Sequence, residues 1–181
     1  MARVDRARFV PPELRAHAYE DVALPIGHEQ TISQPTMVEL LVDALELRGD
    51  EKVLDVGTGS GYQAAILGEL AREVHTIERI PELAEQARSR LPANVHVHVG
   101  DGTNGLPALA PFDAIAVAAA APEPPPALLD QLAPGGRLVI PVGPRDLQTL
   151  TLVVRHGNDW RETPHGQCVF VPLVGPGGFP A

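Results

Sequence analysis

The chain has 181 residues, of which 44% are hydrophobic, and its formal net charge at pH 7 is −9. This length and hydrophobic content suit one well-buried domain and are too small for two ordinary ones. The acidic balance argues against nucleic acid or a membrane surface as a partner, because such binding relies on clustered lysines and arginines. No apolar run approaches the roughly 20 residues that are needed to cross a bilayer.

The sequence contains one cysteine, Cys168, so an intramolecular disulfide cannot form. The first residues also lack the charged and then apolar pattern of a secretory leader. We therefore expect a cytoplasmic protein, and we expect it to be a monomer. No metal is expected, because His96 and His98 lie two apart on a predicted strand without a third ligand, a pattern that favours surface positions.

The amino-terminal part of the chain is predicted to combine short helices with a long loop. Pro11-Pro12 opens a short predicted helix over 13–19, where proline suits the first turn. Residues 22–35 have no sustained period and contain two prolines, which predicts an extended loop of a length that usually carries function. Apolar residues at helical spacing then predict a helix over 37–47. Five of them share one face: Met37, Leu40, Leu41, Ala44 and Leu45.

Residues 52–143 alternate strand and helix over short connections. Such alternation implies a parallel sheet that is covered by helices on both faces. Strands are predicted at 53–56, 73–77, 95–99, 112–118 and 137–142, and helices at 63–71, 82–91 and 127–132.

Two further strands are predicted at 149–154 and 168–173, with no helix between them. We expect them to form an antiparallel pair at one edge of the sheet, where Pro172 is tolerated because it cannot donate to a ladder. Trp160 is expected in the hairpin loop that joins them. The chain is thus predicted to be one α/β domain over 1–181, a three-layer αβα sandwich with a mostly parallel sheet and an antiparallel edge pair. It comprises a helical and loop region (1–51), a ligand-binding core (52–143) and C-terminal strands (144–181).

Gly57, Gly59 and Gly61 follow a predicted strand and precede a predicted helix. They remove the Cβ atoms that would keep a ligand from the backbone, and the helix directs free N–H groups into the same crevice. The dinucleotide fingerprint would place its last glycine on Tyr62, so NAD is the weaker prediction and a purely structural turn is the alternative. Twenty-one residues beyond Gly57, an apolar strand ends in Glu78, where an acid can bind both ribose hydroxyls.

These residues, together with Gly100-Asp101-Gly102, Phe112-Asp113 and the run 132–138, resemble the class I S-adenosylmethionine-dependent methyltransferases. Longer strings over nearly the whole chain resemble the protein-L-isoaspartate O-methyltransferase family. These strings are Phe9–Pro11, Ala18–Asp21, Leu24–Gly27, Gln30–Pro35, Ala119–Glu123 and Phe170–Gly175.

The resemblance implies a Rossmann-like sheet whose last two strands have an order unusual among methyltransferases. It also implies methyl transfer from S-adenosylmethionine, leaving S-adenosylhomocysteine, to the free α-carboxylate of L-isoaspartyl residues in damaged proteins and peptides. The ester then collapses to a succinimide that hydrolyses partly to normal aspartate, which makes the reaction a repair.

The resemblance also implies roles for the acids. Asp55 orders the glycine loop and meets the methionine amino group directly or through water, with a helix-capping carboxylate as the alternative. Glu78 binds ribose, with a solvent-exposed strand end as the alternative. Asp101 and Gly102 hold adenine, a role compatible with a simple Asp-Gly turn. The cofactor-binding residues expected in this way are Asp55, Gly57, Thr58, Gly59, Ser60, Gly61, Glu78, Arg79, Asp101 and Gly102.

Ser33 is the catalytic residue that the resemblance implies. Its hydroxyl can donate to the attacking carboxylate, which is already ionised at pH 7 and needs no base, so that catalysis rests on alignment. The alternative is that Ser33 caps the helix beginning near Met37. The substrate-binding residues expected from the resemblance are Thr31, Ile32, Ser33, Ala119, Ala120 and Ala121.

Two positions depart from the family pattern. Glu29 stands where many bacterial relatives have glycine, and an acid beside a carboxylate site repels the substrate unless its side chain points away. Thr36 stands where an aromatic residue or histidine is frequent. Two other functions therefore stay open: an aspartate O-methyltransferase dedicated to one precursor peptide, and a non-catalytic protein that binds S-adenosylmethionine. The intact Ser33 loop argues against the second.

Overall fold

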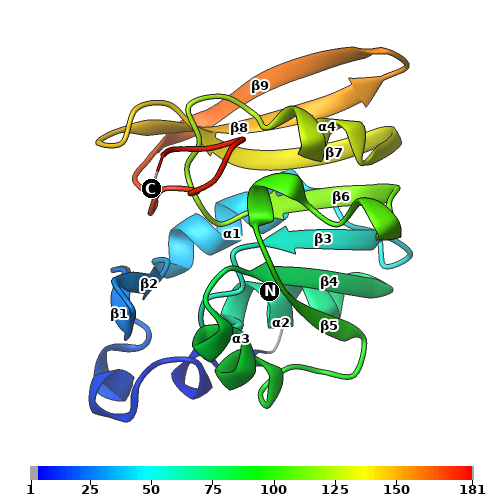
Figure 1. Ribbon diagram of the computed structural model, residues 1–181. Helices are drawn as coiled ribbons and strands as arrows, with labels where there is room; N and C mark the ends of the chain where they lie inside the picture. The colour runs from blue at the N-terminus through cyan, green and yellow to red at the C-terminus, as the bar shows by residue number, and fades with distance from the viewer. Residues whose placement is uncertain (1–3, 181) are drawn as a thin grey trace.

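The computed structural model describes residues 4–180. Its centre is a seven-stranded sheet with the strand order β5-β4-β3-β6-β7-β8-β9 (Figure 1). The strands are β3 (Lys52–Val56), β4 (Glu73–Glu78), β5 (Val95–Val99), β6 (Phe112–Val117), β7 (Leu132–Val142), β8 (Gln148–His156) and β9 (Asp159–Cys168). The helices are α1 (Pro35–Ala44), α2 (Tyr62–Leu70), α3 (Pro81–Arg88) and α4 (Pro126–Asp130).

Strands β5, β4, β3, β6 and β7 pair in parallel, whereas β8 pairs antiparallel with both β7 and β9. The predicted parallel sheet with an antiparallel edge is confirmed. One face packs against α1 and α2, and the other packs against α4, so that β3 and β6 are buried on both sides. Their near-continuous apolar sequences reflect this double burial.

The predicted strands and helices between 52 and 142 are confirmed, with small differences at their ends. The largest difference is at β7, which begins at Leu132 instead of Arg137. The intervening Ala-Pro-Gly-Gly sequence suggests a turn, but the chain stays in the sheet there through an irregular register against β6.

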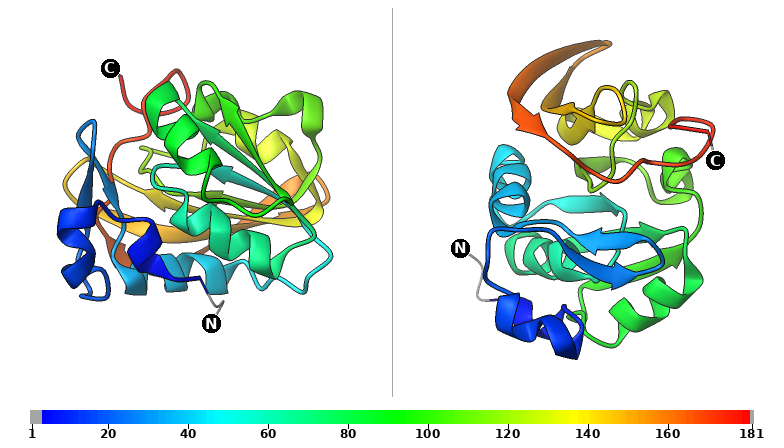
Figure 2. Two further views of the ribbon diagram at one scale, coloured as in Figure 1. Left: turned by 90° about the horizontal axis from the view of Figure 1, so that it is seen from below. Right: turned by 90° about the vertical axis from the view of Figure 1, so that its left-hand side faces the viewer.

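The predicted loop over 22–35 is wrong, because this segment forms a two-stranded hairpin of β1 (Leu24–Gly27) and β2 (Gln30–Ile32). His28 and Glu29 make the turn with positive φ angles of 52° and 58°. Positive angles at both turn residues match the twist of a two-residue hairpin, and glycine or asparagine is their usual sequence signal. Figure 2 shows the hairpin in front of the carboxyl ends of the parallel strands.

Two predictions near α1 also need correction. The short helix over 13–19 is a 3₁₀ helix over Pro12–His17. On α1, Leu40 is 39% exposed, and Val38 and Val42 take the buried positions beside Leu41. The helix begins at Pro35, and the face toward the sheet is rotated relative to the prediction.

The predicted strand over 168–173 is wrong as well. The last strand, β9, ends at Cys168, and the chain then leaves the sheet and crosses to Ala120, whose N–H donates to Val171 O at 2.8 Å. Trp160 lies in β9 itself, with the Arg155 guanidinium 5.4 Å from its ring centre, and not in the hairpin loop. β9 is exposed along nearly its whole length, so it has no apolar alternation that would reveal it.

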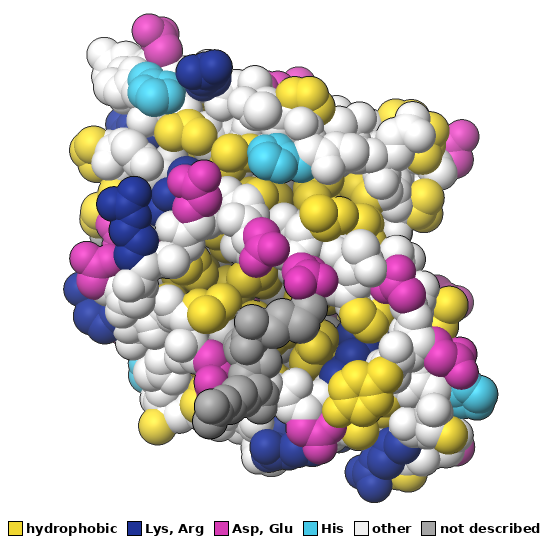
Figure 3. Space-filling model, turned by 180° about the vertical axis from the view of Figure 1, so that it is seen from behind, with side chains coloured by type: hydrophobic (Ala, Val, Ile, Leu, Met, Phe, Trp, Pro, Cys, Tyr) yellow, Lys and Arg dark blue, Asp and Glu magenta, His cyan; other side chains and the backbone are white. Residues whose placement is uncertain are grey.

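Among residues 4–180, no helix is both long and apolar enough to cross a membrane. The face opposite to that of Figure 1 carries interspersed acidic and basic side chains, and its described part shows no continuous basic patch (Figure 3).

Candidate functional site

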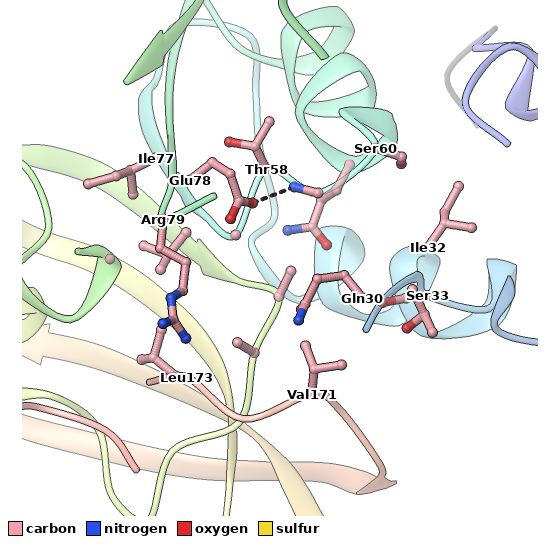
Figure 4. A pocket seen from close by; sticks show the side chains of 18 of the residues that line it. Gln30, Ile32, Ser33, Thr58, Ser60, Ile77, Glu78, Arg79, Val171 and Leu173 are labelled. Atoms are coloured by element: carbon pink, nitrogen blue, oxygen red, sulfur yellow. Dashed lines mark hydrogen bonds between the residues drawn. The ribbon is translucent and has the colours of Figure 1, made fainter. Parts of the chain in front are cut away.

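A cavity opens at the carboxyl ends of the parallel strands and encloses about 800 Å³, its open mouth included. Ligands of open parallel sheets bind at this edge, next to the point where the strand order reverses. The reversal here lies between β3 and β6. Four segments contribute most of the cavity lining (Figure 4): the glycine turn after β3, the end of β4, hairpin strand β2 with Ser33, and the crossing segment after β9. They contribute Gly57–Ser60, Ile77–Arg79, Gln30–Ser33 and Val171–Val174.

The glycine turn needs its glycines for conformation. Gly57, Gly59 and Gly61 have φ angles of 95°, 51° and 89°, a region that side chains disfavour. The turn is attached to the end of β4, because Gly57 N donates to Ile77 O at 3.0 Å and Gly59 N donates to Glu78 Oε2 at 2.8 Å. Of the predicted residues here, Gly57, Thr58, Gly59 and Ser60 line the cavity.

Glu78 lies at the cavity wall and is only 6% exposed, so the alternative of a solvent-exposed strand end is wrong. Its Oε2 accepts from Gly59 N, and its Oε1 accepts from Ile80 N at 3.0 Å. Among the described residues, none of the ion pairs includes Glu78. Each carboxylate oxygen therefore retains acceptor capacity toward the cavity. Arg79, also predicted, lines the same wall but is exposed.

Asp55 is completely buried and does not line the cavity. Its carboxylate accepts from Gln63 Nε2 at 2.7 Å and from Thr76 Oγ1 at 2.6 Å. The predicted direct contact with a ligand amino group is therefore wrong for this geometry. The helix-capping alternative is also wrong, because the N-cap of α2 is Gly61 and no side chain caps it. Burial raises the pKa of Asp55 to about 6.

Asp101 and Gly102, which are both predicted to hold adenine, have different positions relative to the cavity. Gly102 lines the cavity, and a Cβ there would lie 2.6 Å from Val56 Cγ1. Asp101 does not line the cavity; its carboxylate caps the 3₁₀ helix that follows, accepting from Thr103 N at 2.9 Å and from Thr103 Oγ1 at 2.8 Å. The Asp101 side chain thus has the role expected of a simple Asp-Gly turn. Its second oxygen, Oδ2, accepts one long hydrogen bond, from Asn104 Nδ2 at 3.3 Å.

Ser33 lines this cavity and also a smaller adjoining one between α1 and the segment after β9. It does not cap α1, because the N-cap is Gln34 and no side chain makes a capping hydrogen bond. Thr31 and Ile32, which are also predicted to bind substrate, line the main cavity too. The hairpin thus places Ser33 in the same space as the glycine turn.

The alanine run is only partly in the site. Ala119 lines the main cavity together with Ala118. Ala120 and Ala121 are 1% and 0% exposed and do not line it, so their predicted substrate contact is wrong. They are held by backbone hydrogen bonds to Val171 and Pro141.

Several lining residues were not predicted: Gln30, Val38, Val56, Tyr62, Gln63, Ile77 and Val171–Val174. Gln63 follows the glycine turn directly, and that position was its only local signal. The segment Val171–Val174 reaches the site through the crossing chain after β9, which local patterns do not reveal.

His96 and His98 have a third histidine as neighbour, contrary to the prediction. His75 Nδ1 lies 3.1 Å from His98 Nε2, and His75 Nε2 lies 2.9 Å from Glu73 Oε1. His96 is exposed, but His98 is only half-exposed. Within residues 4–180, no group of three or more His, Cys, Asp or Glu side chains has the geometry of a metal site.

Comparison with known proteins gives one consistent result. The family model described as protein-L-isoaspartate(D-aspartate) O-methyltransferase matches residues 1–177. A protein-L-isoaspartate O-methyltransferase 2 of Marinobacter nauticus is 55% identical, with 99% of this chain and 85% of the relative covered. A protein-L-isoaspartate O-methyltransferase of Methanocella arvoryzae is 53% identical, with 99% and 98% covered.

Two solved structures are similar in the same way. One protein-L-isoaspartate O-methyltransferase structure has a TM-score of 0.85 and 27% identity over 97% of this chain, which spans 60% of that longer chain. A Plasmodium falciparum structure, described as a putative protein-L-isoaspartate O-methyltransferase in complex with S-adenosyl-L-homocysteine, has a TM-score of 0.78 and 26% identity. The alignment covers 94% of this chain and 86% of the Plasmodium chain.

Proposed function

Because the chain belongs to the protein-L-isoaspartate O-methyltransferase family, we propose that it transfers a methyl group from S-adenosylmethionine to the free α-carboxylate of L-isoaspartyl residues in damaged proteins and peptides. The observation that carries the proposal is the shared cavity: the Ser33 hairpin and the glycine turn line one space. A cofactor and a peptide that enter it meet there.

The residues present fit S-adenosylmethionine. The glycine turn leaves room for close approach of a ligand to the backbone, and the buried Glu78 carboxylate offers acceptors to ribose hydroxyls. Ile77, Gly102 and Leu173 supply an apolar wall for a purine ring. When bound, the cofactor supplies an electrophilic methyl group on a sulfonium.

Methyl transfer to a carboxylate needs alignment more than acid–base chemistry. The substrate carboxylate is ionised at pH 7, so its oxygen attacks directly: an O–CH₃ bond forms as the S–CH₃ bond breaks. In our proposal, Ser33 Oγ donates to this carboxylate and holds one lone pair in line with the methyl group. Buried Ile32 and the crossing segment at Val171 narrow the cavity around that position and limit the access of water.

A methyl-transfer assay with paired isoaspartyl and aspartyl peptides tests the proposal. We expect transfer to the isoaspartyl peptide alone, and we expect Ser33→Ala to slow it by about 1.5–3 kcal/mol of transition-state stabilisation, the value of one hydrogen bond to a charged group. Ser89→Ala, which removes a surface hydroxyl at the end of α3, is the matched control. Transfer to the aspartyl peptide would instead indicate a dedicated peptide methyltransferase. Tight cofactor binding without transfer to either peptide would indicate a binding protein.

We also propose that the chain acts as a monomer on isoaspartyl proteins, without nucleic acid or membrane as partner. The net charge of −9 supports the absence of nucleic acid and of an anionic membrane surface as partners. Sedimentation of the protein with and without substrate peptide tests it, and a dimer in both conditions contradicts it.

A further inference from the structure

A chain of hydrogen bonds connects buried Asp55 with the cavity. Thr76 Oγ1 donates to Asp55 Oδ2, and Thr76 Oγ1 is in turn 2.6 Å from Thr58 Oγ1. On its other side, Asp55 Oδ1 accepts from Gln63 Nε2. Thr58 and Gln63 line the cavity, whereas Asp55 and Thr76 do not. Both wall residues are therefore in contact, directly or through Thr76, with one carboxylate that the mechanism above does not use.

The directions of these hydrogen bonds follow from counting protons. An ionised carboxylate can only accept, and a threonine hydroxyl has one proton to donate. Since Thr76 uses its proton on Asp55, the proton between the two threonines must come from Thr58. Thr58 then has no proton left for the cavity. Likewise, Asp55 takes the amide nitrogen of Gln63, so Gln63 Oε1 is the amide atom turned away from Asp55.

We infer that Asp55 and Thr76 are positioning residues that make Thr58 and Gln63 hydrogen-bond acceptors toward the positively charged α-ammonium group of the cofactor. The inference rests on the proposed function for the identity of the ligand. It explains why a negative charge is kept, out of contact with the cavity, behind two uncharged wall residues. By accepting hydrogen bonds, the Asp55 carboxylate leaves Thr58 and Gln63 with only acceptor oxygens for the cavity, and its negative charge also attracts the cation.

The arrangement predicts a pH dependence. Among the described neighbours, Glu78 on β4 is the charged group that acts on Asp55, and the partners from α2 and β6, Gln63 and Ala116, are uncharged. Once protonated, Asp55 can donate to Thr76, and the direction of every hydrogen bond up to Thr58 reverses. Binding of a cation should therefore weaken as the pH falls through the region where Asp55 takes up its proton.

Asp55→Asn tests the direction of the chain, because asparagine has the same shape but must donate on one side. If its amide nitrogen faces Thr76, then Thr76 donates to Thr58 and Thr58 turns a proton toward the cavity. If its amide nitrogen faces Gln63, that side chain turns and presents its own nitrogen. In either orientation one acceptor is replaced by a donor. Thr76→Ser keeps the chain intact and is the conservative control, and Thr76→Val removes it.

The measurement is calorimetric titration with S-adenosylhomocysteine and with its analogue in which hydrogen replaces the α-amino group, between about pH 5 and pH 8. We expect Asp55→Asn to weaken the binding of S-adenosylhomocysteine by about tenfold or more, to abolish its pH dependence near pH 6, and to change the binding of the analogue by less than about twofold. Thr76→Val should give a smaller loss with the same selectivity, and Thr76→Ser should resemble the wild type.

Equal weakening of both ligands by Asp55→Asn would overturn the inference, since it would indicate a merely structural role. Unchanged binding of both ligands would overturn it too. The titrations do not involve methyl transfer, so a failure of the repair activity leaves their outcome unaffected. If the wild type binds neither ligand, the proposed cofactor itself is wrong and the inference fails with it.

Discussion

Buried acids lie near both ends of strand β3, and they differ in whether an arginine is among their partners. At the amino end, Glu51 is 5% exposed, accepts from the backbone N–H groups of Arg48 and Gly49, and lies 3.9 Å from the Arg137 guanidinium. At the carboxyl end, Asp55 and Glu78 accept hydrogen bonds from hydroxyl, amide and backbone N–H groups, and within residues 4–180 neither forms an ion pair. The protein thus balances the buried charge at one end with its own Arg137, and in our proposal the cofactor supplies the cation at the other end.

The difference is visible in the proton affinities. Burial alone would raise the pKa of Glu51, but the backbone donors at Arg48 and Gly49 and the charge of Arg137 together lower it. For Asp55, the hydrogen bonds from Thr76 and Gln63 also lower the pKa, but burial and the charge of Glu78 outweigh them and raise it to about 6. An acid whose ionised form is disfavoured costs stability in the ligand-free protein. That cost is reasonable where a positively charged cofactor restores the balance.

The largest expected effect is on the stability of the ligand-free protein. The pKa of Asp55 is raised from 3.8 to about 6. The protonated carboxyl group therefore stabilises the folded protein fully below about pH 3.8, and this stabilisation is lost as the pH rises through about 6. Raising this pKa from 3.8 to about 6 corresponds to about 3 kcal/mol of stability lost at neutral pH. At pH 7.5, Asp55→Asn should therefore unfold at higher urea than the wild type, by up to about 3 kcal/mol, and the difference should vanish near pH 4. If Asp55→Asn is less stable than the wild type at pH 7.5, the ionised Asp55 does not destabilise the ligand-free protein and the two ends of β3 do not differ in this way.

The next largest effect is expected at the amino end of β3, where Arg137 and backbone N–H groups surround Glu51. Glu51→Ala leaves two backbone N–H groups and the Arg137 guanidinium without their acceptor, which should cost about 2 kcal/mol of unfolding free energy. Because the lowered pKa of Glu51 stabilises above about 4.5 and is lost as the pH falls, this difference should shrink in acid. Urea unfolding checks it, with Glu123→Ala as the control, because Glu123 is exposed. Cofactor affinity should not change, and a large loss of affinity would show that the two ends are not independent.

The third effect concerns the ligand end. Glu78→Ala removes the carboxylate that accepts from the ribose hydroxyls, and the loss of one hydrogen bond to a charged group costs about 1.5–3 kcal/mol. S-adenosylmethionine should bind about tenfold more weakly or worse, measured by calorimetry. The variant also releases the N–H groups of Gly59 and Ile80, so Glu78→Gln, which retains one acceptor oxygen, should show an intermediate loss. An unchanged dissociation constant in a folded Glu78→Ala protein removes Glu78 from the site.

The strands and the glycine turn at the ligand end could be predicted because their signals are local. Apolar runs define β3 and β4, and the glycine spacing defines the turn between β3 and α2. The roles of Thr76 and Gln63 could not be predicted in the same way. Thr76 meets Asp55 only because β3 and β4 pair in the register that sets these two residues side by side. A sequence pattern does not contain that register.

The hairpin and β9 were missed for different physical reasons. The hairpin turn uses His28 and Glu29 where glycine or asparagine is the usual signal, and its first strand contains Pro25. β9 pairs with β8 on one side only and is exposed, so its stability comes from backbone pairing that leaves no apolar period. The resemblance located Ser33 and Val171–Val174 as family positions, but only the fold places them in one cavity.

The smallest expected effect separates charge from backbone strain at Glu29, an acid near the ligand end that is exposed and does not line the cavity. Its charge is already solvated, so Glu29→Gln should leave stability and cofactor affinity unchanged. Its φ of 58° costs a side chain about 1–2 kcal/mol, part of which glycine loses again through its greater freedom in the unfolded chain. Glu29→Gly should therefore stabilise the protein by about 0.5 kcal/mol in urea unfolding, and the KM for isoaspartyl peptide should stay unchanged or improve. If Glu29→Gln lowers that KM as much as Glu29→Gly does, the charge of Glu29 acts on the substrate, and the uncompensated charge at this end is not reserved for the cofactor alone.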